Sequence, residues 1–184
     1  MIVLVVLIVV VLLLVALLVG SYNGIVTKRN RCDNAWQQID AQLQRRSDLI
    51  PNLVETVKGY AAHESQTLEA VVAARNSALT ATTPEQKAQA DAELTGALRQ
   101  VFALSEAYPD LKANANFQQL QAQLEETENK VVYARQSFND CVLMYNNAIQ
   151  TFPGVLVAGM GGFAPKAGFE VADSQARQAP QVKF

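Results

Sequence analysis

Apolar residues recur along the first half of the chain at the spacing of an α-helical face. From Trp36 they step by three or four positions, which is typical of one side of a helix. The series contains two charged members and comprises Trp36, Ile39, Leu43, Arg46, Ile50, Leu53, Val57, Tyr60, Glu64, Leu68 and Val71. Its phase passes through Pro51 without a slip, so it predicts one long helix over residues 24–79 with a kink at Pro51. Asp48 is placed to cap a restarted helix, which leaves two helices meeting at this hinge as the alternative.

Two further helical stripes follow. Thr83, Pro84 and Gln86 form a helix start with a capping box. The stripe behind it, which we expect to end before Pro109, is Ala90, Leu94, Ala97, Val101, Leu104 and Tyr108. A last helix should begin at Asn116 and stop before Pro153; its stripe is Phe117, Leu120, Leu124, Thr127, Val131, Ala134, Phe138, Cys141, Tyr145, Ala148 and Phe152. Residues 21–153 therefore predict an all-α antiparallel helical bundle of up to four helices, the first one long and kinked.

The last part of the chain, residues 154–184, differs in pattern. It opens on the apolar, glycine-rich "GVLVAGMGGF" and shows no helical phase, so we expect an extended C-terminal tail. Its candidate docking residues are Phe163, Phe169, Val182 and Phe184. Such a tail can lie in a groove of its own bundle, insert at the membrane surface or add to a neighbouring subunit. We expect the neighbouring subunit, because extended arms commonly tie protomers together.

The beginning of the chain predicts a membrane anchor over residues 1–20. No polar side chain occurs from Ile2 to Val19, and a helix of this length spans the roughly 30 Å of a bilayer's hydrocarbon core. A cleaved signal peptide is the alternative, but a basic leading region and a clear cleavage site are missing. Lys28, Arg29 and Arg31 follow the apolar run and no basic side chain precedes it. This asymmetry predicts a single-pass protein of the cell (inner) membrane with its N-terminus outside and its bundle in the cytoplasm.

The composition argues against several kinds of chemistry. A net charge of −2 gives no basic field to attract nucleic acid. Cys32 and Cys141 are a single pair far apart in sequence, which makes no disulfide framework. His63 is the one histidine, whereas a di-metal carboxylate site in a bundle needs two Glu-x-x-His motifs. No phosphate-binding glycine motif with its lysine is present. We therefore expect neither an enzyme nor a cofactor.

Charged and polar residues around the helical stripe form the remaining candidate site. Arg46 lies on the stripe itself, where a charge is costly unless it is paired. Asp48 offers a local partner, and the last helix offers Glu125, Glu126 or Glu128. The pattern fits a solvated polar face and equally a polar layer inside the bundle. The candidate residues of this layer are Trp36, Asp40, Arg45, Arg46, Asn52, Glu55, His63, Glu64 and Arg135.

Several longer stretches resemble one protein family. They include "YNGIV", "AWQQIDAQLQRRSDLIPNLVETVKGYAAHE", "VVAARN", "YPDLKANANFQQLQAQLEETENKVVYARQSFND", "YNNAIQTFPG" and "APQVKF". Together they resemble the LemA family over nearly the whole chain. The most recognisable segment falls on Trp36, Ile39, Asp40, Arg45, Arg46, Asp48, Pro51, Asn52, Leu53, Lys58, Tyr60, His63 and Glu64. The sequence departs from the family at Ser47, where an aromatic residue is frequent, and in the loose, glycine-rich "VAGMGGFAPKAGFE".

The resemblance implies an N-terminal membrane anchor and an antiparallel helical bundle, with no established enzymatic activity. With the anchor and the long helical seams, it predicts a membrane-anchored helical scaffold that self-assembles. Its expected partners are the lipid bilayer and further copies of the chain, as in a coiled-coil or bundle homo-oligomer. The alternative is an adaptor or sensor that binds another membrane protein, such as a protease or a signalling protein.

Overall fold

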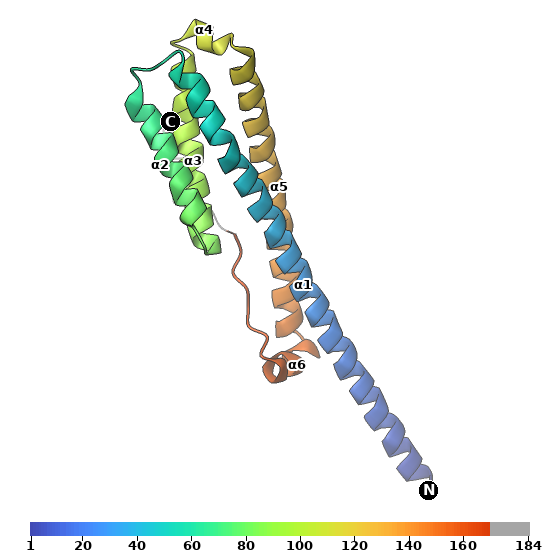
Figure 1. Ribbon diagram of the computed structural model, residues 1–184. Coiled ribbons are helices and arrows are strands. Elements are labelled where there is room, and N and C mark those ends of the chain that lie inside the picture. Colours follow the sequence, from blue (N-terminus) through green and yellow to red (C-terminus); the bar gives the residue numbers. More distant parts are fainter. Residues whose placement is uncertain (170–184) are drawn as a thin grey trace, which may run out of the picture. The chain divides into compact units, whose positions relative to one another are not determined.

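The structure, a computed structural model, describes residues 1–169 and is built from helices (Figure 1). In chain order these are α1 Ile2–Lys58, α2 Ser65–Thr80, α3 Pro84–Ser105, α4 Pro109–Lys112, α5 Ala115–Gln150 and α6 Gly154–Gly161. No strand occurs within residues 1–169, so the predicted all-α class is confirmed. Val182 and Phe184 lie outside the described residues.

Contacts divide the chain into two units, which cut across the expected boundaries at residues 20 and 153. The paired-helix unit consists of Met1–Ile39 and Tyr133–Gly168. Within the described residues, the four-helix unit consists of Asp40–Val132 and Phe169. Helices α1 and α5 each contribute to both units.

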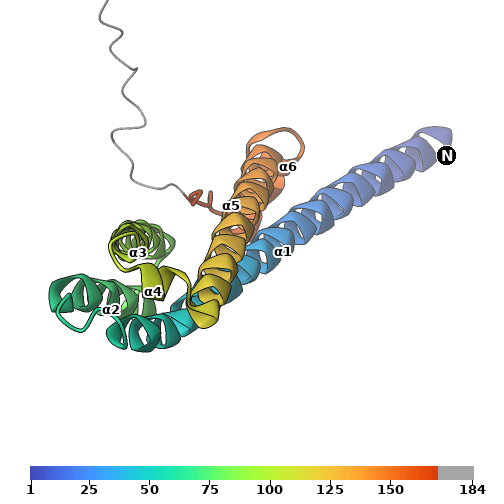
Figure 2. The same ribbon diagram turned by 90° about the horizontal axis from the view of Figure 1, so that it is seen from above.

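The four-helix unit is the antiparallel bundle that the sequence predicts. The last part of α1, then α2, α3 and the first part of α5 run alternately up and down (Figure 1), and α4 connects α3 to α5 (Figure 2). Apolar positions of all four helices meet in one core, as the stripes require. The core comprises Ile50, Leu53, Val54, Val57, Ala61, Leu68, Val71, Ala74, Leu94, Ala97, Leu98, Val101, Leu111, Phe117, Leu120 and Leu124.

Two helix starts in this unit are fixed by side-chain caps. The predicted capping box before α3 is confirmed, because Gln86 N–H donates to Thr83 Oγ1 and Gln86 Oε1 accepts from Thr83 N–H. At α5 the expected cap was wrong by two residues. Asn114, not Asn116, accepts a hydrogen bond from the backbone N–H of Phe117, at 3.0 Å, and the helix begins at Ala115.

The expected helix over residues 24–79 was wrong at its far end. Helix α1 starts within the apolar run and stops at Lys58, and a turn over residues 59–64 separates it from α2. Pro51 lies on the exposed side of an uninterrupted α1, so the helix does not restart at Asp48. Because proline has no N–H, the carbonyl of Ser47 loses its usual helical donor. The guanidinium of Arg75 on α2 takes that place, with its Nε 3.0 Å from the Ser47 oxygen.

The paired-helix unit joins α1 and the last part of α5 side by side in opposite directions. The rings of Trp36 and Phe138 lie 5.4 Å apart between centroids, and further toward the N-terminus Ile25 approaches Gly154. Cys32 is fully buried on α1, and burial, followed by the nearby Cys141, raises the pKa of its thiol. A thiol with a raised pKa stays protonated and unreactive at neutral pH, which suits a small packing residue.

The start of the tail is helical, which the sequence did not predict. Helix α6 covers Gly154–Gly161, with Val157 and Ala158 buried against the unit. Its interior glycine lowers intrinsic helix propensity, so tertiary burial of one face decides the conformation. Gly162 then ends the helix with φ 65°, a left-handed geometry that glycine adopts without strain.

The described part of the tail then packs on its own chain. After α6, Phe163 stacks edge-on against Tyr22, with 5.5 Å between ring centroids. Tyr145 O–H donates to the carbonyl of Ala164, and Asn146 exchanges two hydrogen bonds with the Lys166 backbone. The expected docking on a neighbouring subunit was therefore wrong for residues 163–168, which dock in cis. Phe169, the last described residue, is also buried.

The apolar beginning of α1 has no cover in the structure. Every side chain from Ile2 to Leu17 is exposed, as is Val19. By length and composition α1 contains a stretch able to cross a membrane.

Candidate functional site

A buried ion cluster joins three helices of the four-helix unit. Arg46 on α1 is only 3% exposed, and its Nη1 lies 2.6 Å from Asp91 Oδ1 on α3 and 2.6 Å from Glu128 Oε2 on α5. Asp91 is buried, whereas Glu128 is partly exposed. We call these three residues the Arg46 cluster. Arginine suits such a position because it stays charged when buried and its planar head faces several acceptors.

The Arg46 cluster does not satisfy all of its polar atoms. The Nε of Arg46 is buried and has no hydrogen-bond partner within the described chain. Glu128 Oε2 is close to Arg46 but outside hydrogen-bonding geometry, so their contact is an ion pair alone. A buried donor without a partner costs about 1–3 kcal/mol. The cluster is therefore poor evidence for extra stability, and it fits better with fixing which helices pack together.

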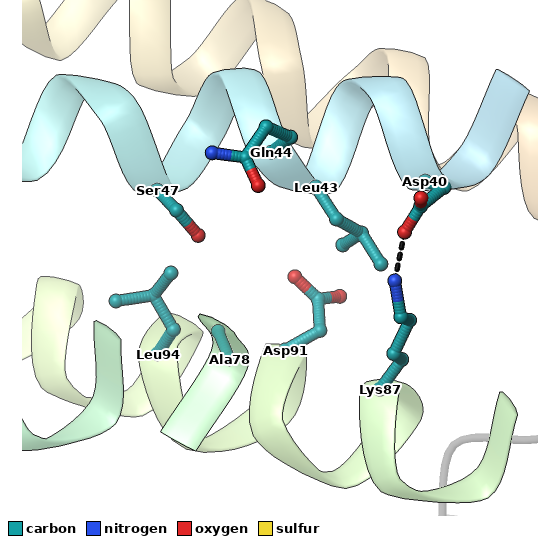
Figure 3. A pocket seen from close by; sticks show the side chains of 8 residues that line it. All are labelled: Asp40, Leu43, Gln44, Ser47, Ala78, Lys87, Asp91 and Leu94. Atoms are coloured by element: carbon teal, nitrogen blue, oxygen red, sulfur yellow. Dashed lines mark hydrogen bonds and ion pairs between the residues drawn. The ribbon is translucent and has the colours of Figure 1, made fainter. Parts of the chain in front are cut away.

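A second ion pair and a small cavity adjoin the cluster. Lys87 on α3 contacts Asp40 on α1, and the cavity lies between these two helices beside Ala78 of α2 (Figure 3). The side-chain oxygens of Ser47 and Asp91 point toward it (Figure 3). Its volume of about 20 Å³ accommodates a single water molecule, so it cannot hold an organic cofactor.

A wider depression reaches the cluster from the surface. It has a volume of about 340 Å³, and both Arg46 and Glu128 line it. Arg99 and Glu125 add one further charge of each sign at its edge. Opposite charges in equal number give no strong field for either an anion or a cation.

The other residues predicted for a polar layer do not gather around Arg46. Arg45, Asn52, Glu55 and His63 are exposed. Asn52 and Glu55 line a depression on the polar surface together with Gln119 of α5. These positions therefore belong to a solvated polar face, which is one of the two interpretations that the sequence allowed.

Three predicted residues have local structural partners or lie in the other unit. Glu64, in the turn after α1, accepts a hydrogen bond from Tyr108 O–H at 3.1 Å, and this bond raises the pKa of Tyr108. Trp36 packs against Phe138 in the paired-helix unit. Arg135 is half-buried on α5 in the same unit.

Asp91 is the one cluster member that the sequence analysis missed. It directly follows Ala90, which belongs to the predicted apolar stripe of α3. The helical pattern therefore predicts a surface position for Asp91. One signal in the sequence pointed to Asp91. Its carboxylate lies immediately beside one apolar stripe, and an arginine on another stripe needs a partner. Glu128, by contrast, was one of three acidic residues named as partners for Arg46.

The site contains few groups of the kind that catalyse reactions or bind metal ions. Within residues 1–169, no group of three or more histidine, cysteine, aspartate and glutamate side chains is placed to hold a metal ion. The Arg46 cluster consists of one guanidinium and two carboxylates, and His63, exposed in the turn after α1, is not a member of it. What the arrangement does is connect α1, α3 and α5 through one charged side chain.

Comparison with known proteins is consistent with this architecture. A model of the LemA family matches residues 35–184 of the chain. "Protein LemA" of Metamycoplasma hominis is 30% identical over 139 residues, which cover 73% of this chain and 62% of that protein. The chain thus spans less than two thirds of the length of this relative.

Proposed function

The chain belongs to the LemA family, and we propose that it is a membrane-anchored helical interaction protein that assembles with further copies of itself. The observation that carries this proposal is the uncovered apolar start of α1, continuous with the helix on which the bundle is built. An apolar helix of that length left in water would be strongly unfavourable, and a bilayer removes the cost. Anchoring is then a direct consequence of the same helix that positions the Arg46 cluster.

The proposed orientation places the N-terminus outside and the bundle in the cytoplasm. Lys28, Arg29 and Arg31 follow the apolar run closely, within the distance over which basic residues set topology. The membrane is the cell (inner) membrane, crossed once.

Topology is tested by labelling engineered cysteines in intact cells. We expect an impermeant maleimide to label a cysteine in a short polar extension ahead of Met1 and to leave Asn23→Cys unlabelled until the cells are opened, because the two sites flank the bilayer. The wild-type chain, with Cys32 buried and Cys141 half-buried, gives the background. Labelling of Asn23→Cys from outside, with the cysteine ahead of Met1 protected, contradicts the orientation.

Self-assembly is supported by apolar side chains that α5 leaves exposed. Tyr133 is 72% and Met144 is 57% exposed, and eleven residues correspond to about three helical turns, so both lie on one face. Tyrosine and methionine are enriched in protein interfaces. Leu143, next to Met144, is also exposed.

Oligomer size provides the corresponding measurement. After cross-linking in membranes and native electrophoresis in mild detergent, we expect species well above the 20.0 kDa of one chain. Met144→Glu should reduce their amount, because a charge would have to be desolvated in the interface. Leu79→Glu, at an exposed position of α2, is the matched control and should not.

Affinity capture of the chain from solubilised membranes, together with its oligomer size, separates the alternative function. An adaptor or sensor for another membrane protein would bring down one different protein at a fixed ratio, and a chain that is monomeric in every condition would refute self-assembly. The adaptor alternative is supported by an apolar surface groove of the four-helix unit. Its lining includes Val54, Leu68 and Val72.

A further inference from the structure

Helix α6 is apolar on both of its faces. Its sequence, "GVLVAGMG", contains no polar side chain. Gly154, Val157 and Ala158 face the paired-helix unit and are buried, whereas Val155, Leu156 and Met160 are exposed on the opposite face. Met160 is the most exposed of them, at 87%. A helix that is hydrophobic all round normally lies in a core or in a membrane.

The end of α6 lies close to the end of the anchor. The apolar run ends at Val19, and Tyr22 follows about 4.5 Å further along the helix axis. A Cβ at Gly161, the last residue of α6, would lie 3.5 Å from the Tyr22 ring. The first residue of α6, Gly154, is beside Ile25, about 9 Å beyond Val19. Both placements are within the paired-helix unit.

These positions correspond to the headgroup region of a bilayer. Headgroups occupy roughly 5–8 Å on each side of the hydrocarbon core. If α1 crosses the membrane up to Val19, the end of α6 is at headgroup depth and its start is at the outer edge. Tyr22 is at the level where tyrosine is enriched in membrane proteins.

Basic side chains surround the same place. Arg29 lies over the ring of Phe163, with its Cζ 5.4 Å from the centroid, directly after α6. Lys28 is one residue away on α1. Cations at this depth favour an anionic lipid surface by about 1 kcal/mol each. The extended segment after Phe163 then runs back along α5 toward Asn139, away from the anchor.

We propose that α6 is an interfacial membrane helix, with Val155, Leu156 and Met160 inserted between the lipid headgroups beside the anchor. This inference rests on the proposed membrane anchoring, because the anchor is what brings α6 to the lipid surface. Lipid is the occupant that fits, because the exposed side chains of α6 are apolar and the helix ends beside Tyr22, three residues after the apolar run of α1. A chain held in this way contacts the bilayer at two points, which restrains rotation of α1 about its axis.

The test places a single tryptophan at chosen depths in the full-length chain. In a Trp36→Phe background, tryptophan is introduced at Leu156, Met160, Val10 or Tyr133. Each variant is reconstituted into vesicles of phosphatidylcholine and phosphatidylglycerol with brominated acyl chains, which quench tryptophan on contact. Tyr133 is the matched control, because it is exposed on α5 about 26 Å before the end of that helix. Met160 is so exposed that tryptophan there displaces no packed atoms.

We expect quenching at positions 156 and 160 to exceed that at position 133 by at least about twofold, with position 10 quenched most strongly. Quenching at position 10 without quenching at 156 and 160 overturns the interfacial helix and leaves the anchor intact. No quenching at position 10 refutes the anchor, and the interfacial helix with it. Blue-shifted but unquenched emission at 156 and 160 that depends on protein density shows a second copy covering α6, which also overturns the proposal.

Discussion

Replacing Arg46 by methionine should destabilise the four-helix unit by about 3–5 kcal/mol. The substitution keeps an unbranched apolar side chain but removes the guanidinium charge that Asp91 and Glu128 face at 2.6 Å. Asp91 is buried, so its carboxylate cannot simply turn to water. The measurement is urea-induced loss of the helical signal in mild detergent.

The neighbouring arginine is a matched control. Arg45 is exposed on the same helix, so Arg45→Met should change the free energy of unfolding by no more than about 0.5 kcal/mol. Equal effects at the two positions would show that the Arg46 cluster does not hold the helices together.

A triple variant separates stability from specificity. Removing the whole cluster as Arg46→Met, Asp91→Asn and Glu128→Gln should recover more than half of the loss, because no isolated charge is then buried. Recovery of stability together with a broadened melting transition would indicate that the cluster selects one packing of α1, α3 and α5. Failure of the triple variant to recover any stability would contradict the ion-pair explanation.

The stripe of apolar residues was a good guide where helices are long. It predicted the core positions Ile50, Leu53, Val57, Leu68 and Val71 and the capping box before α3, because both patterns depend on residues that are close in sequence. Tyr60, which belongs to the same stripe, is exposed. The stripe failed at the end of α1 for a specific reason. The turn over residues 59–64 happens to return the chain to the same helical phase, so the pattern continues although the helix does not.

Partners of single polar groups were harder to predict, because they depend on which helices meet. Because Pro51 has no N–H, the Ser47 carbonyl lacks its usual helical donor. The replacement donor, the guanidinium of Arg75, comes from another helix. The sequence also showed that Arg46 needs a carboxylate, but the position of Asp91 beside the stripe of α3 did not decide whether its side chain would face inward. Helix α6 was missed because its glycines argue against a helix, and only the buried face of Val157 and Ala158 stabilises it.

Replacing Gly154 by alanine should displace α6 at a cost of about 1–3 kcal/mol. A Cβ at this position would lie 1.9 Å from the carbonyl oxygen of Ala148 on α5 and 3.5 Å from Ile25 Cδ1. The first contact is with backbone, so no side-chain rotation relieves it, and the start of α6 must move. We expect a lower melting temperature and faster proteolysis at the junction between α5 and α6.

Gly159 on the same helix provides the control. A Cβ there meets nothing within 4 Å, and the residue has an ordinary helical φ. Gly159→Ala should therefore stabilise α6 by about 0.5–1 kcal/mol, because alanine has less backbone freedom to lose than glycine. If both variants melt like the wild type, α6 does not pack tightly on α5, and the geometry that brings its apolar face to the anchor loses its support.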